Sequence, residues 1–91
     1  MNDDFRVWKQ LTTVETRCEM AIVNLSAIVE EIDFTIFLIS STGLPVGTGS
    51  MKYVSSLLGA IKRELESSAD KAHKERVKRQ EKIFDAMEDN E

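Results

Sequence analysis

Apolar residues recur at heptad spacing through the first part of the chain, and this pattern predicts a long helix over residues 4–40. Positions seven residues apart form three columns on such a helix. The first column contains Leu11, Cys18, Leu25, Ile32 and Ile39. The second contains Val7, Val14, Ala21, Ile28 and Thr35, and the third contains Trp8, Ile22, Val29 and Ile36, with Glu15 interrupting it. We expect the first two columns to form the main seam and the third to widen it.

Residues 34–39 are apolar on nearly every side of the expected helix. Their β-branched and aromatic side chains are also compatible with a strand. Because the heptad pattern runs into this segment without a break, a helix is the favoured interpretation.

Residues 41–50 are expected to form a loop, since Gly43, Pro45, Gly47 and Gly49 disfavour helix. Aspartates at positions 3 and 4 are candidate caps for the first helix, and Ser50 for the second. A second helix is predicted over residues 51–88. Its apolar positions are Met51, Val54, Leu57, Leu58, Ile61, Leu65, Ile83, Phe84 and Met87.

When the chain is folded back at the loop, residues whose numbers add to about 91 lie level with one another. Large side chains then meet large ones near both ends, and small ones meet near Ala21 and Ala69. The stripe is wider than one neighbouring helix can cover. We therefore predict an all-α fold, an antiparallel helical hairpin that pairs into a homodimeric four-helix bundle. The expected oligomer interface is formed by Val7, Trp8, Leu11, Val14, Ala21, Ile22, Leu25, Ile28, Val29, Ile32, Ile36, Ile39, Val54, Leu58, Ile61 and Leu65.

The 91 residues are sufficient for one small domain, assigned to residues 1–91. Cys18 is the single cysteine, so no internal disulfide can form, and this fits a reducing compartment. The acidic start of the chain is unlike a signal or transit peptide. Glycines and a proline interrupt the longest uncharged stretch, so no membrane span is expected. We expect a cytoplasmic protein.

Side chains able to bind metal are few. Cys18 and His73 fall at a similar level, but a closed site needs about four ligands. Acidic residues on both expected helices suggest Mg²⁺-dependent nucleotide hydrolysis, which all-α pyrophosphatases perform with a Glu-Glu-x-x-Glu motif. The stretch from Glu30 to Asp33 departs from that spacing. We expect solvated charges here, with no cofactor and no metal site.

A basic run on the second expected helix could follow a nucleic-acid backbone. Its members are Lys71, Lys74, Arg76, Lys78, Arg79 and Lys82. Glu75 and Glu81 interrupt the run, no aromatic residue lies within it, and the net charge of the chain is −4. Binding to nucleic acid is therefore the second hypothesis, and a Mg²⁺-dependent hydrolase is the third.

The leading hypothesis is a non-enzymatic adaptor, inhibitor or regulator that binds another protein. Aromatic residues away from the main seam would be typical of such an interface. The candidate partner-binding residues are Phe34, Phe37, Leu38, Leu44 and Val46. The same aromatic residues could instead cover the other helices of a dimer.

Overall fold

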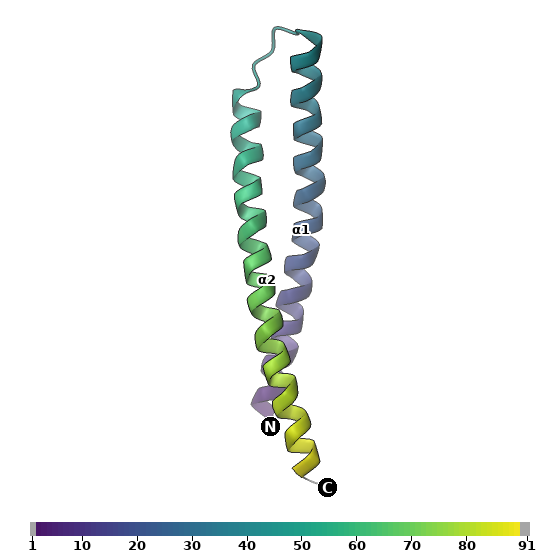
Figure 1. Cartoon of the computed structure of the whole chain (residues 1–91), viewed down its shortest axis with the longest axis vertical. Coiled ribbons are helices and arrows are strands. Elements are labelled where there is room, and N and C mark those ends of the chain that lie inside the picture. Colours follow the sequence, from purple (N-terminus) through teal and green to yellow (C-terminus); the bar gives the residue numbers. More distant parts are fainter. Residues whose placement is uncertain (1, 90–91) are drawn as a thin grey trace.

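The chain folds into two long helices that run antiparallel side by side (Figure 1). The computed structural model describes residues 2–89. Helix α1 spans Asn2–Thr42 and helix α2 spans Gly49–Asp89, with 41 residues each. All regular structure within the described residues is helical. The prediction of an all-α hairpin is confirmed, including a helix rather than a strand over residues 34–39.

Both helices reach further than the sequence predicted. Helix α1 ends at Thr42 because Gly43 adopts a left-handed φ of 68°, which stops the helix. The loop contains a tight turn across Pro45, in which the Val46 amide donates to the Leu44 carbonyl at 2.8 Å. Helix α2 then begins with the Lys52 amide donating to the Thr48 carbonyl at 2.9 Å.

The expected capping residues lie inside the helices. Helix α2 starts at Gly49, so Ser50 is already helical and Thr48 occupies the capping position. Aspartates 3 and 4 likewise belong to the first turn of α1. Their negative charges still interact favourably with the positive end of the helix dipole.

One row of half-buried positions on each helix forms the contact between α1 and α2, and we call these two rows the seam. Its positions are separated alternately by three and four residues, as expected for two helices that follow each other over many turns. On α1 the seam contains Asp4, Trp8, Leu11, Glu15, Cys18, Ile22, Leu25, Val29, Ile32, Ile36 and Ile39. On α2 it contains Met51, Ser55, Leu58, Lys62, Leu65, Ala69, Ala72, Arg76, Arg79, Ile83 and Ala86.

In the structure, the third expected column of α1 takes the place of the second one in the seam. The column of Trp8, Ile22, Val29 and Ile36 faces α2, whereas Val14, Ile28 and Thr35 of the expected main column are exposed. Our assignment of these three residues to the main seam was wrong, whereas Val7 and Ala21 of the same column are half-buried. The apolar stripe of α1 is wider than the seam. Helix α2 contacts the two columns that match its own seam, and the remaining column lies beside the contact.

Contacts between the helices define the register. Ser55 donates to Asp33 at 2.7 Å, and Glu15 contacts both His73 and Arg76. These pairs lie within about one helical turn of the expected alignment.

The hairpin is elongated and has little interior. It measures 73 × 15 × 14 Å, with a radius of gyration of 20.6 Å. A compact domain of this length would have a radius of gyration of about 12 Å. Within residues 2–89, the single buried hydrophobic residue is Ala72, at 7% exposure. The described part of the chain also has no helical stretch apolar enough to cross a membrane.

Candidate functional site

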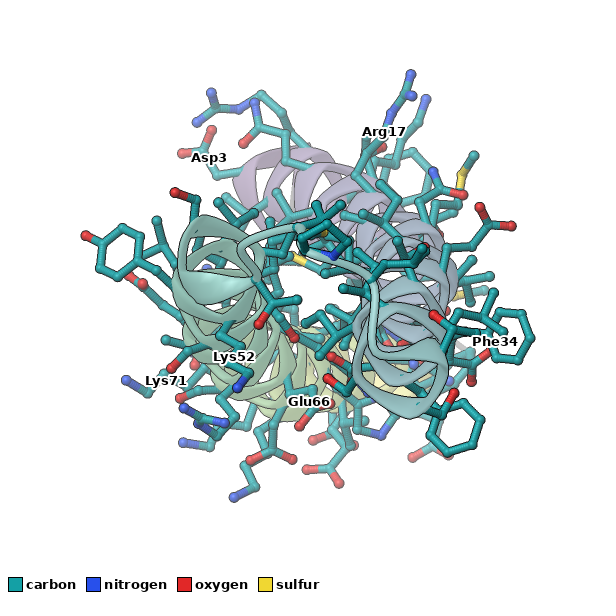
Figure 2. All side chains as sticks on the ribbon, turned by 90° about the horizontal axis from the view of Figure 1, so that it is seen from above. Asp3, Arg17, Phe34, Lys52, Glu66 and Lys71 are labelled. Carbon is teal, nitrogen blue, oxygen red and sulfur yellow. The ribbon has the colours of Figure 1, made fainter. Side chains whose placement is uncertain are left out.

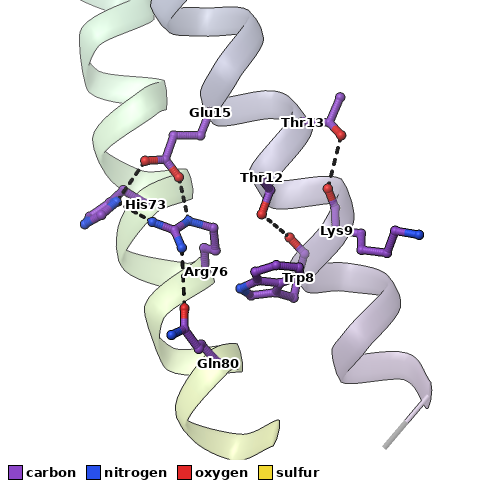
Figure 3. Close-up of polar contacts among 8 residues, drawn as sticks. All are labelled: Trp8, Lys9, Thr12, Thr13, Glu15, His73, Arg76 and Gln80. Carbon is purple, nitrogen blue, oxygen red and sulfur yellow. Dashed lines mark hydrogen bonds and ion pairs between the residues drawn. The ribbon is translucent and has the colours of Figure 1, made fainter.

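The most structured polar site is a cluster around Glu15, which occupies a seam position of α1. Its carboxylate accepts from Arg76 Nε at 2.7 Å and lies 2.8 Å from His73 Nδ1 (Figure 3). Arg76 also donates to Gln80 at 3.5 Å. Only 15% of the Glu15 side chain is exposed. A carboxylate that replaces an apolar residue in the seam is thus compensated by two residues of α2.

Hydrogen bonding orients the His73 ring. Its Nδ1 lies 2.8 Å from the Glu15 carboxylate and 3.1 Å from Arg76 Nη2. One nitrogen cannot donate to the first group and accept from the second at the same time. Donation to the carboxylate is the favoured arrangement, because a carboxylate is an acceptor only. His73 therefore reinforces the pairing of Glu15 with Arg76.

A second ion pair lies nearer the chain ends. Arg79 donates to Asp4 at 2.6 Å, and its Nε lies 3.6 Å from Glu75. The hydrogen bond from Arg79 lowers the pKa of Asp4 below its ordinary value, although partial burial opposes the shift. The Arg79 pKa is raised by the same bond. The pKa of Glu15 is lowered in the same way, first by the hydrogen bond from Arg76 and then by His73.

These groups are paired with one another across the two helices, so each ion pair favours one alignment of α1 and α2. Within residues 2–89, no three or more His, Cys, Asp or Glu side chains are grouped for a metal ion. Cys18 is half-buried in the seam, and His73 bonds to Glu15. The candidate Mg²⁺ carboxylates Glu30 and Glu31 are exposed on α1. Asp33 is engaged by Ser55.

The basic run divides between the seam and one exposed face of α2. Arg76 and Arg79 lie in the seam and pair with Glu15 and Asp4. Lys74 is exposed and lies 3.1 Å from Asp70 on its own helix. The exposed lysines of the run are Lys71, Lys74, Lys78 and Lys82. Fewer positive charges are therefore available to phosphates than the sequence pattern indicated.

The candidate partner-binding residues are all exposed near the loop. Phe34 and Phe37 are 61% and 62% exposed and stack with ring centroids 6.5 Å apart. Figure 2 shows Phe34 pointing away from α2. Leu38, Leu44 and Val46 are also exposed. The hairpin itself covers none of these five side chains.

The expected interface residues separate into two groups. The half-buried group is Val7, Trp8, Leu11, Ala21, Ile22, Leu25, Val29, Ile32, Ile36, Ile39, Leu58 and Leu65. The exposed group is Val14, Ile28, Val54 and Ile61. Folding of one chain thus covers the first group partly and leaves the second group exposed.

A shallow apolar groove of about 290 Å³ lies at the end where the termini meet. It is lined by Phe5, Trp8, Gln80, Ile83, Phe84 and Met87. Phe5 stacks on Trp8 with ring centroids 6.0 Å apart. The sequence predicts that large side chains of the two helices meet at this end, but the groove itself was not predicted.

Neither ion pair between the helices was predicted from the sequence. The signal was present in the alternating spacing of the α2 seam, which continues from Leu65 through Ala69 and Ala72 to Arg76 and Arg79. Glu15 was recognised as an interruption of an apolar column but was not paired. Extending the spacing through charged residues would have placed both arginines in the seam.

Comparison with known proteins gives no significant match to a protein-family model, to a curated protein or to a solved structure.

Proposed function

We propose that this chain is a non-enzymatic protein-interaction module that acts as a homodimer, with two hairpins forming a four-helix bundle. The observation that carries this proposal is the surface area of the single hairpin, which is 6851 Å². A folded monomer of this mass exposes about 5,400 Å². Each hairpin therefore carries an excess of about 1,500 Å², comparable to what one partner buries in a large obligate dimer interface.

The distribution of exposed apolar residues supports the same proposal. Val14, Ile28, Val54, Leu57 and Ile61 are between 40% and 48% exposed in the hairpin. Isolated exposed apolar side chains are normal on a protein surface, but several on the same side of a molecule are typical of an interface. Burying each of them would contribute about 1–2 kcal/mol, which a marginally stable hairpin needs.

The oligomeric state is tested by sedimentation equilibrium at micromolar concentration, with circular dichroism on the same samples. We expect a dimer whose thermal midpoint rises with concentration, because association stabilises the folded chain. A helical monomer that melts cooperatively would overturn the proposal.

The proposed binding site for another protein is at the loop end. Aromatic side chains are common anchors of interfaces, and Phe34 and Phe37 are exposed outside the seam. The adjacent loop adds Leu44 and Val46, which are also exposed. These residues lie on the outer side of α1 and in the loop. A dimer formed through the side of the hairpin that carries Ile28 and Ile61 therefore leaves them accessible.

The double substitution Phe34→Ser with Phe37→Ser tests this site. We expect affinity capture from the native host to lose the partner recovered by the unchanged chain, while the thermal midpoint stays the same. The exposed pair Thr13→Ala with Ala27→Ser, on the same side of α1, is the control. Collapse of the fold would show that both phenylalanines are structural and would contradict this assignment.

Two other functions remain predictions. Binding to DNA or RNA through the exposed lysines of α2 would weaken steeply as salt concentration increases. Hydrolysis of nucleotides that depends on Mg²⁺ would reveal an enzyme. The absence of a disulfide partner for Cys18 in the sequence fits a reducing compartment, and we propose the cytoplasm.

A further inference from the structure

One flank of the hairpin has mostly apolar side chains directly beside the seam, whereas the other has mostly polar ones there and is apolar only near the termini. We use the term apolar flank for Val14, Ile28, Val54, Leu57 and Ile61. Val14 and Ile28 each precede a seam residue of α1 that belongs to the Trp8 column. Val54 and Ile61 precede the equivalent seam residues of α2, namely Ser55 and Lys62. In an antiparallel pair, the positions that precede these seam residues on both helices lie on the same side, and Leu57 extends that side.

The opposite flank is identified by residues that follow seam positions. Near the loop, a surface groove on this flank is lined by five polar residues and two apolar ones, namely Asp33, Ser40, Lys52, Ser55 and Ser56 with Ile36 and Phe37. Figure 2 shows Lys52 and Glu66 on this side, with Arg17 on the other. The two flanks therefore differ in chemistry, and a partner that buries apolar area would bind the apolar one.

We infer that the apolar flank binds a second copy of this chain in one orientation, with both loops at the same end of a four-helix bundle. This inference rests on the proposed dimer and specifies its geometry. The excess area per chain, about 1,500 Å², sets the amount that the partner copy must cover.

The chemistry along the flank selects this orientation. Ile28, Val54, Leu57 and Ile61 lie toward the loop, whereas Glu75 and Lys82 occupy the equivalent flank positions nearer the termini. A bundle with its loops at opposite ends, overlapped over the full length, would press the apolar cluster of one copy against these charges. Desolvating charged side chains against an apolar surface is costly, even though Arg79 lies 3.6 Å from Glu75. With both loops at one end, the apolar clusters pack against each other and the charged positions meet at the other end.

A staggered bundle, in which only the loop halves overlap, would also bring the apolar clusters together. It would leave Val14 uncovered, and the contact would extend over about half of a helix that is roughly 60 Å long. Overlap over the full length accounts better for the excess area. The outward-facing Phe34 then occurs twice at one end of the dimer, so the proposed partner site is bivalent.

Spin-label distances test the orientation. In a Cys18→Ala background, one sample carries a label at Thr42→Cys beside the loop, and another carries a label at Thr13→Cys near the termini. Both positions are exposed. With loops at the same end, both distances between copies should be below about 35 Å, because neighbouring helix axes are roughly 8–10 Å apart. At least one distance above about 50 Å would show opposed loops and overturn the inference.

A pair of lysine substitutions tests which face of the hairpin forms the contact between the two copies. Leu57→Lys should weaken the dimer at least about tenfold in sedimentation, since it places a charge in the apolar contact. Ser56→Lys, the exposed neighbour on the polar side, should leave it unchanged. An equal effect of both variants would overturn the assignment of the face. If the unchanged chain sediments as a monomer and shows no dipolar coupling, the proposed function itself fails, which is a separate outcome.

Discussion

The half of the hairpin nearer the loop and the half nearer the termini are held together by different interactions. In the loop half, the seam consists largely of Val29, Ile32, Ile36, Leu58 and Leu65. In the terminal half, small residues such as Ala72 are followed by ion pairs that join Glu15 to Arg76 and Asp4 to Arg79.

The two halves therefore contribute differently to the stability of the hairpin and to the specificity of its helix alignment. Apolar contacts are non-directional and tolerate more than one partner or register. A charge in the seam is costly unless its counterpart is opposite, so ion pairs disfavour other alignments. The loop half is therefore held together mainly by apolar contacts between α1 and α2. The terminal half fixes how the two helices align.

The largest effect is expected from a charge in the loop-half seam. Ile32→Asp should prevent folding, because an unpaired carboxylate in the centre of the half-buried seam costs on the order of several kcal/mol and the chain is small. Lys78→Glu, on the exposed side of α2, should change the free energy of unfolding by less than about 0.5 kcal/mol. Thermal melts followed by circular dichroism measure both. Equal destabilisation would mean that the seam has been assigned to the wrong faces.

A smaller effect should come from shortening a residue of the apolar flank. Ile61→Ala should lower the free energy of unfolding by about 2 kcal/mol if a second copy covers this side chain. Tyr53→Ala, on the outer side of α2, should change it by less than about 0.5 kcal/mol. Chemical denaturation measures both variants. Similar values would show that Ile61 remains exposed in solution and that the flank has no partner.

In the terminal half, removal of one charge should reduce stability and alter its dependence on pH. The pKa of Glu15 is lower in the folded chain than its ordinary value of 4.5. The stabilisation is therefore present above pH 4.5 and is lost as pH falls through the folded pKa. Glu15→Gln should melt at a lower temperature at pH 7, and its melting curve should approach that of the unchanged chain on acidification.

The control for this experiment is Glu19→Gln, four residues further along α1 and exposed. It should leave the melting temperature at pH 7 nearly unchanged. If both glutamine variants behave alike at every pH, the cluster around Glu15 contributes nothing specific to stability.

The smallest effect is expected at the loop. Gly43 has a φ of 68°, and an added Cβ would meet no neighbouring atom, so Gly43→Ala acts through the backbone alone. It should lower the free energy of unfolding by about 1 kcal/mol. Gly47→Ala lacks this strain and should be neutral or slightly stabilising, because it restricts the unfolded chain. A comparable loss for both would indicate a different loop conformation in solution.

The sequence alone determined the two helices and the break between them. Heptad spacing makes each helix amphipathic, and the glycines and proline of the loop interrupt the pattern, so local chemistry is sufficient. The antiparallel arrangement followed from matching large and small side chains such as Leu25, Leu65 and Ala69. The position of Phe34 outside the seam was likewise predicted, and whether it binds a partner or covers the other helices of a dimer stays a prediction.

The tertiary structure decided which columns of the wide stripe meet. Val14 and Ile28 have the same apolar character as Val29, and periodicity cannot rank them. The choice depends on the facing helix, whose seam includes Arg76 and Arg79 and therefore requires Glu15 and Asp4 opposite. Charged side chains reveal such a role only when both partners are placed in space, because the favourable energy belongs to the pair and not to either residue.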